Sequence, residues 1–191
     1  MTLWFTADTH FDHAKIIEHS HRPFANVAEM NEALIENWNA NVQPGDTVWH
    51  LGDVAFRSKQ PIDAWLRRLN GHINIVLGNH DRTSEALGSR AASVQDVKYL
   101  RHEKQRLWLS HYAHRTWRNS NHGALHLFGH SHGDLLVTDG RLMDVGVDAV
   151  ARWAADGRPL YAEAYRPLKF EEVVALLERQ PATDHHVGVP Q

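Results

Sequence analysis

The stretch Leu3-Trp4-Phe5-Thr6-Ala7-Asp8-Thr9-His10 is a short apolar run that ends on a carboxylate and an imidazole. Residues 47–53 repeat this order, with Thr47-Val48-Trp49-His50-Leu51 directly before Gly52-Asp53. Residues 73–81 repeat it again, with Ile73-Asn74-Ile75-Val76-Leu77 before Gly78-Asn79-His80-Asp81. Short apolar runs bounded by turn residues predict buried strands. The polar residues are therefore expected just beyond the carboxyl ends of three strands.

Helices are predicted between these strands. Asn26 and Glu29 form a capping-box-like start, and apolar residues follow at helical spacing as far as Trp38. A second helix is expected to begin near Pro61 and to end at Asn70-Gly71. The alternation of strands and helices predicts an α/β domain with parallel strands.

The second half of the chain has a different pattern. Strands are predicted in hairpin-like succession over residues 94–100, 106–109, 124–128 and 141–147, and a last helix follows Pro167. No internal repeat or linker interrupts the sequence, so we expect one domain over residues 1–180. Residues 181–191 contain little that could be buried and are expected to form a disordered tail.

Two further polar clusters, Ser110-His111 and Gly129-His130-Ser131-His132, also follow predicted strands. In α/β sheets, ligands bind outside the carboxyl ends of the strands, so all five clusters are expected at one rim. Carboxylate, imidazole and amide oxygen are the donors that hold borderline and hard divalent metals. The pattern therefore predicts a metal site assembled from distant turns.

Two divalent ions about 3.5–4 Å apart activate a water and hold the oxygens of an in-line displacement at phosphorus. Such a pair needs a shared carboxylate, and Asp53 is the natural choice because Gly52 permits a tight turn beneath it. His80 is then left to protonate the leaving group, with Asp81 orienting it. The expected ligands of one ion are Asp8, His10 and His132, and those of the other are Asn79, His111 and His130.

Between Asp8 and His132 the chain contains the complete pattern D-x-H, GD, GNH[DE], H and GHxH. This pattern resembles that of the calcineurin-like metallophosphoesterases, and most closely a small bacterial and phage-type subgroup. The stretch Val145-Gly146-Val147-Asp148 matches a further segment of that subgroup. The resemblance implies a four-layer α/β/β/α sandwich with two mixed central sheets. It also implies hydrolysis of phosphoesters by a metal-bridging hydroxide, with two ions drawn from Mn, Fe, Zn, Co and Ni, of which Mn is favoured.

Composition narrows the class of substrate. The 191 residues carry a formal net charge of −3 with histidine neutral, and no basic tract for gripping long nucleic acid is visible. We therefore expect hydrolysis of a small phosphodiester, with no extended nucleic-acid partner. The candidate substrate-binding residues are His13, Arg22 and Arg57. Arg57 corresponds to the phosphate-binding arginine in the GDxVDRG motif of the Ser/Thr protein phosphatases.

The sequence also bears on location. No signal-peptide pattern or long apolar run is present, and the chain has no cysteine, so we expect a cytoplasmic protein without a membrane contact. The oligomeric state is not indicated by any pattern.

Three alternative functions remain at this level. A nuclease or nucleic-acid end-processing enzyme would use the same centre, although the acidic balance argues against it. A phosphomonoesterase would also use the same residues. A non-catalytic scaffold would be expected to have lost ligands or the acid, and all of them are present here.

Overall fold

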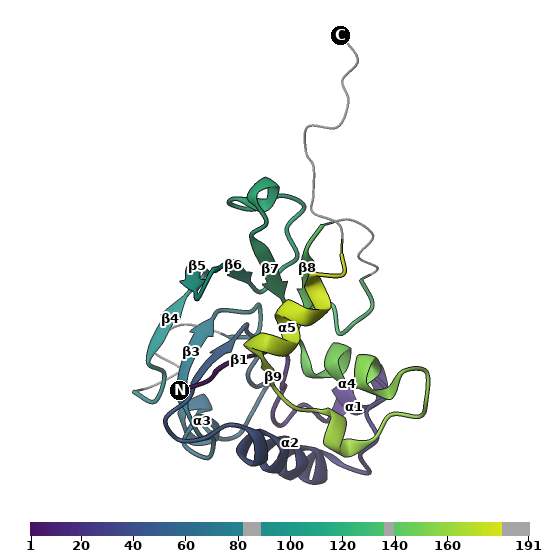
Figure 1. Ribbon diagram of the computed structural model, residues 1–191. Coiled ribbons are helices and arrows are strands. Elements are labelled where there is room, and N and C mark those ends of the chain that lie inside the picture. Colours follow the sequence, from purple (N-terminus) through teal and green to yellow (C-terminus); the bar gives the residue numbers. More distant parts are fainter. Residues whose placement is uncertain (82–88, 136–139, 181–191) are drawn as a thin grey trace.

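The computed structural model describes residues 1–81, 89–135 and 140–180, so the predicted tail lies outside the described residues. Two sheets pack face to face, one of five strands in the order β4-β3-β2-β1-β9 and one of four in the order β5-β6-β7-β8 (Figure 1). Both sheets contain parallel and antiparallel pairs. The expectation of two mixed central sheets is confirmed.

The first sheet is built from the apolar runs that the sequence predicts as strands. It contains β1 (Leu3–Thr6), β2 (Thr47–His50), β3 (His72–Val76), β4 (Ser93–Gln95) and β9 (Leu168–Lys169). Strands β1 to β4 are parallel, and β9 pairs with β1 in the antiparallel direction. The central strands are covered on both faces, which explains why their sequences are nearly continuously apolar.

Helices cover the outer face of this sheet. They are α1 (Ala14–His19), α2 (Val27–Asn41) and α3 (Ile62–Leu66). The predicted start of α2 is confirmed, because the Glu29 amide donates to Asn26 Oδ1 over 3.0 Å. Sequence patterns missed α1, and α3 ends earlier than its apolar stripe suggested. Met30 and Trp38 of α2 pack in one apolar cluster with Val48 and Ile73 of the sheet.

The second sheet contains β5 (Val97–His102), β6 (Gln105–Ser110), β7 (Leu125–Phe128) and β8 (Leu142–Asp144). Only β5 and β6 form a hairpin, whereas β6, β7 and β8 run parallel. The expected hairpin succession is therefore wrong beyond β6, because the chain crosses back outside the sheet before each new strand. The predicted strand over residues 94–100 is also two strands, which belong to different sheets.

The layers follow from the apolar clusters. Phe5 and Leu51 meet Leu109 and Leu127 between the sheets. The outer face of the second sheet is covered by residues 111–124, which include the short 3-10 helix η2 (Ser120–His122). The order of layers is thus α/β/β/α, with a thin fourth layer. Trp117 is buried in that layer and its Nε1 donates to the Ala124 carbonyl, so it packs as a core residue.

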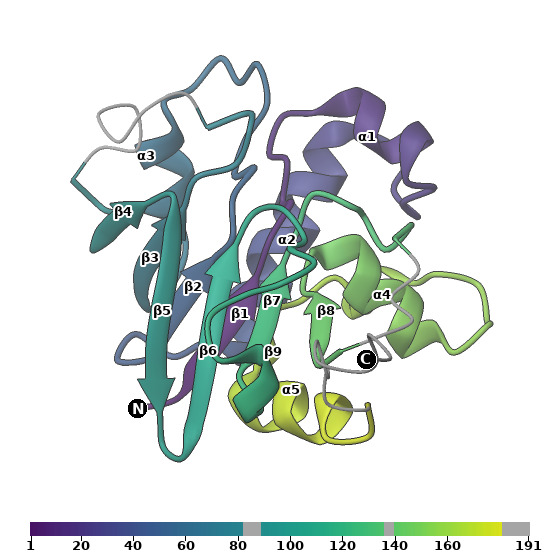
Figure 2. The same cartoon turned by 90° about the horizontal axis from the view of Figure 1, so that it is seen from above.

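Two more helices lie beside the edges of the sheets (Figure 2). The sequence patterns missed α4 (Val147–Ala155), whereas α5 (Phe170–Leu177) is the predicted last helix, and the 3-10 helix η3 (Ala162–Ala164) lies between them. Within the described ranges, no helix combines the length and apolarity needed to cross a membrane.

Candidate metal centre

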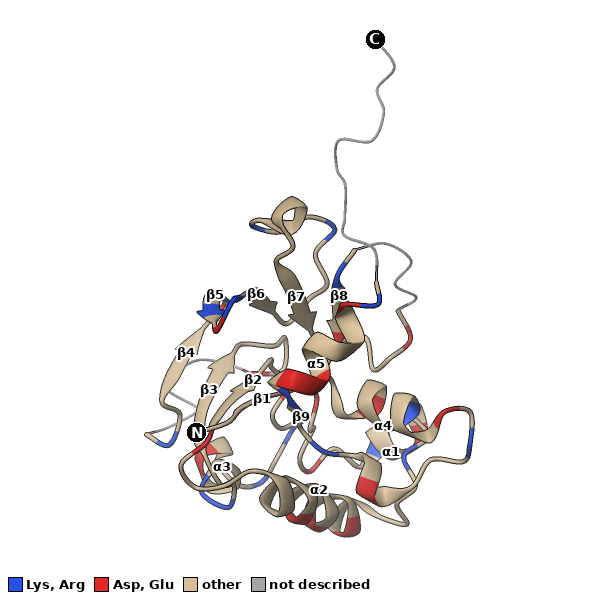
Figure 3. Ribbon diagram, in the orientation of Figure 1, with Lys and Arg blue, Asp and Glu red and all other residues tan. Residues whose placement is uncertain are grey.

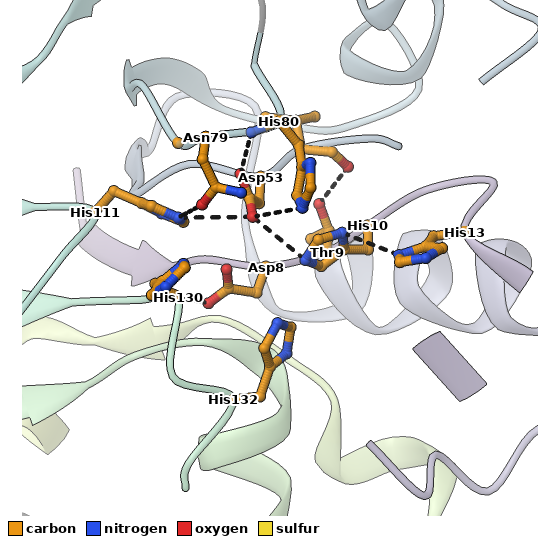
Figure 4. Close-up of polar contacts among 12 residues, drawn as sticks. Asp8, Thr9, His10, His13, Asp53, Asn79, His80, His111, His130 and His132 are labelled. Carbon is orange, nitrogen blue, oxygen red and sulfur yellow. Dashed lines mark hydrogen bonds and ion pairs between the residues drawn. The ribbon is translucent and has the colours of Figure 1, made fainter. Parts of the chain in front are cut away.

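Five loops that follow β1, β2, β3, β6 and β7 converge at one rim of the paired sheets (Figure 4). The loops are joined by main-chain hydrogen bonds, including Asp8 N to Gly52 O at 3.0 Å and Gly129 N to His111 O at 3.0 Å. Ala7 also forms a parallel bridge with Gly146, which links the two sheets. The convergence of the sequence clusters at one rim therefore rests on the pairing of the strands.

The side chains form two groups, each with ligand atoms within 4.8 Å of one another. The first group is Asp8, His10 and His132, and the second is Asp53, His111 and His130. Asn79 joins the second group, since its Oδ1 lies 3.0 Å from His111 Nε2. The structure thus brings together every residue that the sequence predicts as a metal ligand.

Asp53 is the member of the second group that also faces the first group. Its Oδ2 is 3.5 Å from His10 Nε2 and 3.6 Å from His111 Nε2, and its side chain is buried. One carboxylate oxygen therefore faces a nitrogen of each group, which is the position that a shared ligand requires.

Hydrogen bonds orient two of the imidazole rings. His111 Nδ1 lies 2.8 Å from the Leu51 carbonyl oxygen and His132 Nδ1 lies 2.7 Å from Asp148 Oδ2. A carbonyl or carboxylate oxygen accepts a proton from Nδ1, and in that tautomer the Nε2 lone pair is left for a ligand. Both rings are therefore oriented by an oxygen at Nδ1.

Two buried atoms in the first group lack a hydrogen-bond partner among the described residues: Asp8 Oδ1 and His10 Nε2. Burial raises the pKa of Asp8 well above its usual value, and the nearby carboxylates Asp144 and Asp53 raise it further. Burial lowers the pKa of His10 well below its usual value, and the Arg22 cation adds to this. A divalent cation would satisfy both atoms and offset the crowding of acids. The residues present thus fit a metal ion.

Five of the ligands have left-handed backbone conformations, with φ of 57° at Asp8, 50° at His10, 57° at Asp53, 66° at His130 and 49° at His132. Residues other than glycine rarely adopt this region, and each such residue costs on the order of 1–3 kcal/mol. Gly52 has φ of +97°, and a Cβ there would lie 2.5 Å from Gly78 N. The predicted tight turn beneath Asp53 is therefore confirmed, and it is part of a strained rim that surrounding contacts must hold.

His80 belongs to neither group of ligands. Its side chain is 31% exposed, and its Nε2 lies 3.8 Å from Asp53 Oδ2. Its ring packs edge-on against Phe56 at 4.4 Å between centroids. His80 therefore stands at the open side of the centre with one ring nitrogen directed toward the shared carboxylate.

The expectation that Asp81 orients His80 needs correction. Asp81 is buried and accepts hydrogen bonds from the main-chain amides of Asp53 at 2.7 Å, Gly78 at 2.9 Å and Val54 at 3.1 Å. Burial raises the pKa of Asp81, although these three amide donors act in the opposite direction. Asp81 thus ties the loop after β2 to the loop after β3, and we assign it the role of holding the main chain of these two loops.

The expected substrate contact of Arg22 also needs correction. Arg22 is buried and pairs with Asp148 through Nε and an NH2 nitrogen, both at 2.8 Å. Burial works to raise the pKa of Asp148, but Arg22 and His132 together lower it below its usual value. Arg22 is thus engaged inside the protein. The sequence did not point to this partner, although the stretch ending in Asp148 had been noted.

The two other candidate substrate residues lie near His80. His13 is partly buried, with Nδ1 3.4 Å from His10 Nδ1, and burial lowers its pKa to about 4. Arg57 is exposed, and its guanidinium lies 5.2 Å from the centre of the Phe56 ring. Arg57 and His80 also line one pocket of about 320 Å³. Sequence patterns did not point to Phe56, which separates His13 from His80.

Tyr112 was also missed as a residue of the rim. The residue is 49% exposed, and its ring lies 4.7 Å from the His130 ring and 5.0 Å from the His111 ring, between centroids. An exposed aromatic directly after a predicted ligand was the available signal. Tyr112 places an aromatic surface beside the second group.

Comparison with known proteins gives a consistent family. The model of the calcineurin-like phosphoesterase superfamily domain matches residues 1–158. A protein of Methanocaldococcus jannaschii is 45% identical over 85 residues, which are 44% of this chain and 48% of that protein. The chain thus matches about half the length of this relative.

Two other similar proteins are matched over most of their length. The Gene 66 protein of Mycobacterium phage D29 is 29% identical over 178 residues, covering 77% of this chain and 88% of the phage protein. The crystal structure of the protein AQ665 of Aquifex aeolicus covers 92% of this chain and 98% of its own, with 24% identity and a TM-score of 0.66. The similarity to the Aquifex aeolicus structure shows that the two proteins share a fold.

Proposed function

The chain belongs to the calcineurin-like phosphoesterase superfamily, and from this premise we propose that it hydrolyses small phosphodiesters. The reaction depends on metal ions, and His80 acts as the general acid. The observation that carries the proposal is the position of His80. It lies beside Asp53 yet outside both ligand groups, and its side chain is partly open to solvent. An alkyl phosphodiester requires such an acid, because its leaving alkoxide is a strong base.

The two ligand groups would hold two divalent ions, with Asp8, His10 and His132 at one and Asn79, His111 and His130 at the other, and Asp53 shared. When bound, such a pair supplies an activated water and stabilises charge on the phosphoryl oxygens. Mixed nitrogen and oxygen donors suit Mn, Fe, Zn, Co or Ni, and we favour Mn.

The chain itself supplies the proton and the orientation of the leaving group. His80 Nε2 is the ring nitrogen directed at the shared carboxylate, so it is the atom from which a proton would pass to the leaving oxygen. Phe56 packs against the His80 ring and limits its rotation. Because the acid is fixed at the edge of the centre, the leaving group would depart on the side of His80.

Features on two sides of the centre support a diester. The pocket lined by Arg57, Ser58, Gln60 and His80 has a volume of about 320 Å³, which is enough for a small polar group. Tyr112 offers an exposed ring beside the second group. A substrate with one group in the pocket and another against Tyr112 would use both.

The distribution of charge favours a small substrate. Lys and Arg are spread over separate elements of the described chain (Figure 3). Long nucleic acid is usually bound by several phosphate contacts and with a steep dependence on salt. Arg115 and Arg118 are exposed in the segment after His111, and they are the observation that favours a nuclease as second candidate.

Because the sequence contains no cysteine, we also propose that the protein acts in the cytoplasm.

Substitution of the acid tests the proposal. His80→Ala should slow hydrolysis of a cyclic nucleotide by roughly 10²–10⁴-fold while metal content stays near two ions per chain. A bis-aryl phosphate should be affected much less, since its leaving group departs without a proton. Turnover of both substrates and elemental analysis after Mn²⁺ loading are the measurements. His72→Ala, an exposed histidine at the start of β3, is the matched control.

Equal losses on both substrates would remove His80 from the role of acid. A long oligonucleotide should be a poor substrate and should show little gain at low salt. Efficient cleavage that falls steeply as salt rises would instead favour the nuclease.

A further inference from the structure

A buried ion pair lies directly behind the first ligand group. Arg22 Nε donates to Asp148 Oδ1 and an Arg22 NH2 nitrogen donates to Asp148 Oδ2, each over 2.8 Å. The two side chains are 0% and 1% exposed. The residues are 126 positions apart in the sequence, so only the fold brings them together.

The remaining donors of Arg22 hold the loop after β1. They contact the carbonyl oxygens of Asp8 at 2.8 Å and Thr9 at 3.0 Å, and Met30 Sδ at 3.4 Å. These carbonyls belong to the segment in which Asp8 and His10 have positive φ. Arg22 therefore stabilises the strained conformation that directs both ligands into the first group.

Asp148 completes the connection to the third ligand. Its Oδ2 accepts the Nδ1 proton of His132 over 2.7 Å, while the same oxygen accepts from Arg22. The pair thus contacts two members of the first group, Asp8 through its main-chain carbonyl and His132 through its imidazole. It also contacts the carbonyl of Thr9, which lies between Asp8 and His10 in the sequence. Carboxylates that hold a ligating imidazole in this way set both its tautomer and its orientation.

The second group is held by other contacts. Asp53 is fixed by the bonds of Asp81 to the main chain, and His111 is oriented by the Leu51 carbonyl. The His130 amide donates to Asp8 Oδ2 over 2.9 Å. This bond and that of the His10 amide, which donates to the Asp53 carbonyl over 3.1 Å, link the second group to the loop that Arg22 holds.

We propose that Arg22 and Asp148 are positioning residues for the first ligand group, so that loss of the pair weakens metal binding at one position and spares the other. This inference rests on the proposed function, because it presumes that both groups bind metal. Loss of a group that holds a metal ligand typically lowers metal affinity by about 10–100-fold, and we expect that decrease at one position only.

The test uses the full-length protein with Mn²⁺ alone as the probe. Asp148→Asn keeps the shape of the side chain but leaves the buried Arg22 cation unpaired, which can impair folding. The double variant Arg22→Met/Asp148→Asn removes both charges and is the second arm. The control is Arg166→Met/Glu172→Gln, which removes a partly buried bidentate pair at α5 with bonds of 2.7 and 3.1 Å.

The readouts are Mn²⁺ stoichiometry by calorimetry and the electron paramagnetic resonance signal, with circular dichroism to verify folding. Wild type and control should bind two ions with the signal of a coupled pair. Folded Asp148→Asn and the double variant should keep one tight ion with an uncoupled signal, and should bind the second about 10–100-fold more weakly. Their profile should match that of His132→Ala and differ from that of His111→Ala.

Two results would overturn the inference. One is a folded double variant that retains both affinities within twofold of wild type, and the other is a parallel loss at both positions. Failure of the proposed function is distinguishable, because wild-type protein would then bind no Mn²⁺ while its circular dichroism remained that of a folded protein.

Discussion

The two ligand groups use similar side chains but are supported in different ways. The first group is buried, and it depends on the Arg22–Asp148 pair, whose members lie on segments far apart in the chain. The second group is more open, with His130 and Asn79 exposed, and Asp81 ties its loops through main-chain amides. Two neighbouring groups of candidate ligands are thus supported largely by separate parts of the fold.

The buried state of the first group explains its support. The carbonyl oxygens of Asp8 and Thr9 and the Asp148 carboxylate are removed from water and therefore need hydrogen bonds. Arg22 supplies them, because a guanidinium group carries five N–H donors. The second group borders solvent and Tyr112, and needs fewer internal partners. Three measurements test whether the two groups have separate supports.

Substitution of the shared ligand should have the largest effect. Asp53→Asn removes the one carboxylate that faces both groups, so both ions and turnover should be lost together. The loss of activity should exceed the roughly 10²–10⁴-fold decrease expected for His80→Ala, which spares metal. Elemental analysis and turnover after Mn²⁺ loading check this. One retained tight ion would show that Asp53 is not shared.

Substitution of Asp81 should have an intermediate effect on the opposite position. Asp81→Asn keeps the size of the side chain but presents an amide NH2 toward main-chain amides, so the loops after β2 and β3 should loosen. We expect about 10–100-fold weaker Mn²⁺ binding at the second position, with the first retained. A calorimetric titration beside Asp148→Asn measures this. If both variants emptied the same position, the division between the two supports would be wrong.

Acid should produce the most gradual effect. Burial lowers the pKa of His50 to about 3 and that of His126 to about 4, and burial also lowers the pKa of His10. Between pH 6.5 and about 4 the unfolded chain therefore binds more protons than the folded chain. The free energy of unfolding of the metal-free protein should fall as pH is lowered through this window, by about 1.4 kcal/mol per pH unit for each such proton.

Asp8 contributes with the opposite sign. Its pKa is raised in the folded protein, so its share of the stability falls as pH rises above 3.8 toward the folded value. Added Mn²⁺ should remove this penalty and should stabilise most near neutral pH, where the ligand histidines are uncharged. Urea unfolding at several pH values, with and without Mn²⁺, is the measurement. A metal-free stability that stayed flat between pH 6.5 and 4 would contradict the sign.

The sequence by itself determined the three buried strands of the first sheet, the capped start of α2 and the position of each polar cluster after a strand. These features are local, because an apolar run, a cap and a turn are legible within about ten residues. The gathering of the clusters also followed, since the carboxyl ends of parallel strands meet at one rim.

Which side chains face one another across that rim depends on tertiary packing. Arg22 was expected to contact substrate and Asp81 to orient His80, but the fold pairs Arg22 with Asp148 and directs Asp81 to main-chain amides. The parallel run of β6, β7 and β8 was likewise invisible in strand patterns that also suit hairpins. The physical reason is the same in each case. The partner of a charged side chain or of a strand edge is set by the packing of segments far apart in the sequence, and local periodicity does not predict that packing.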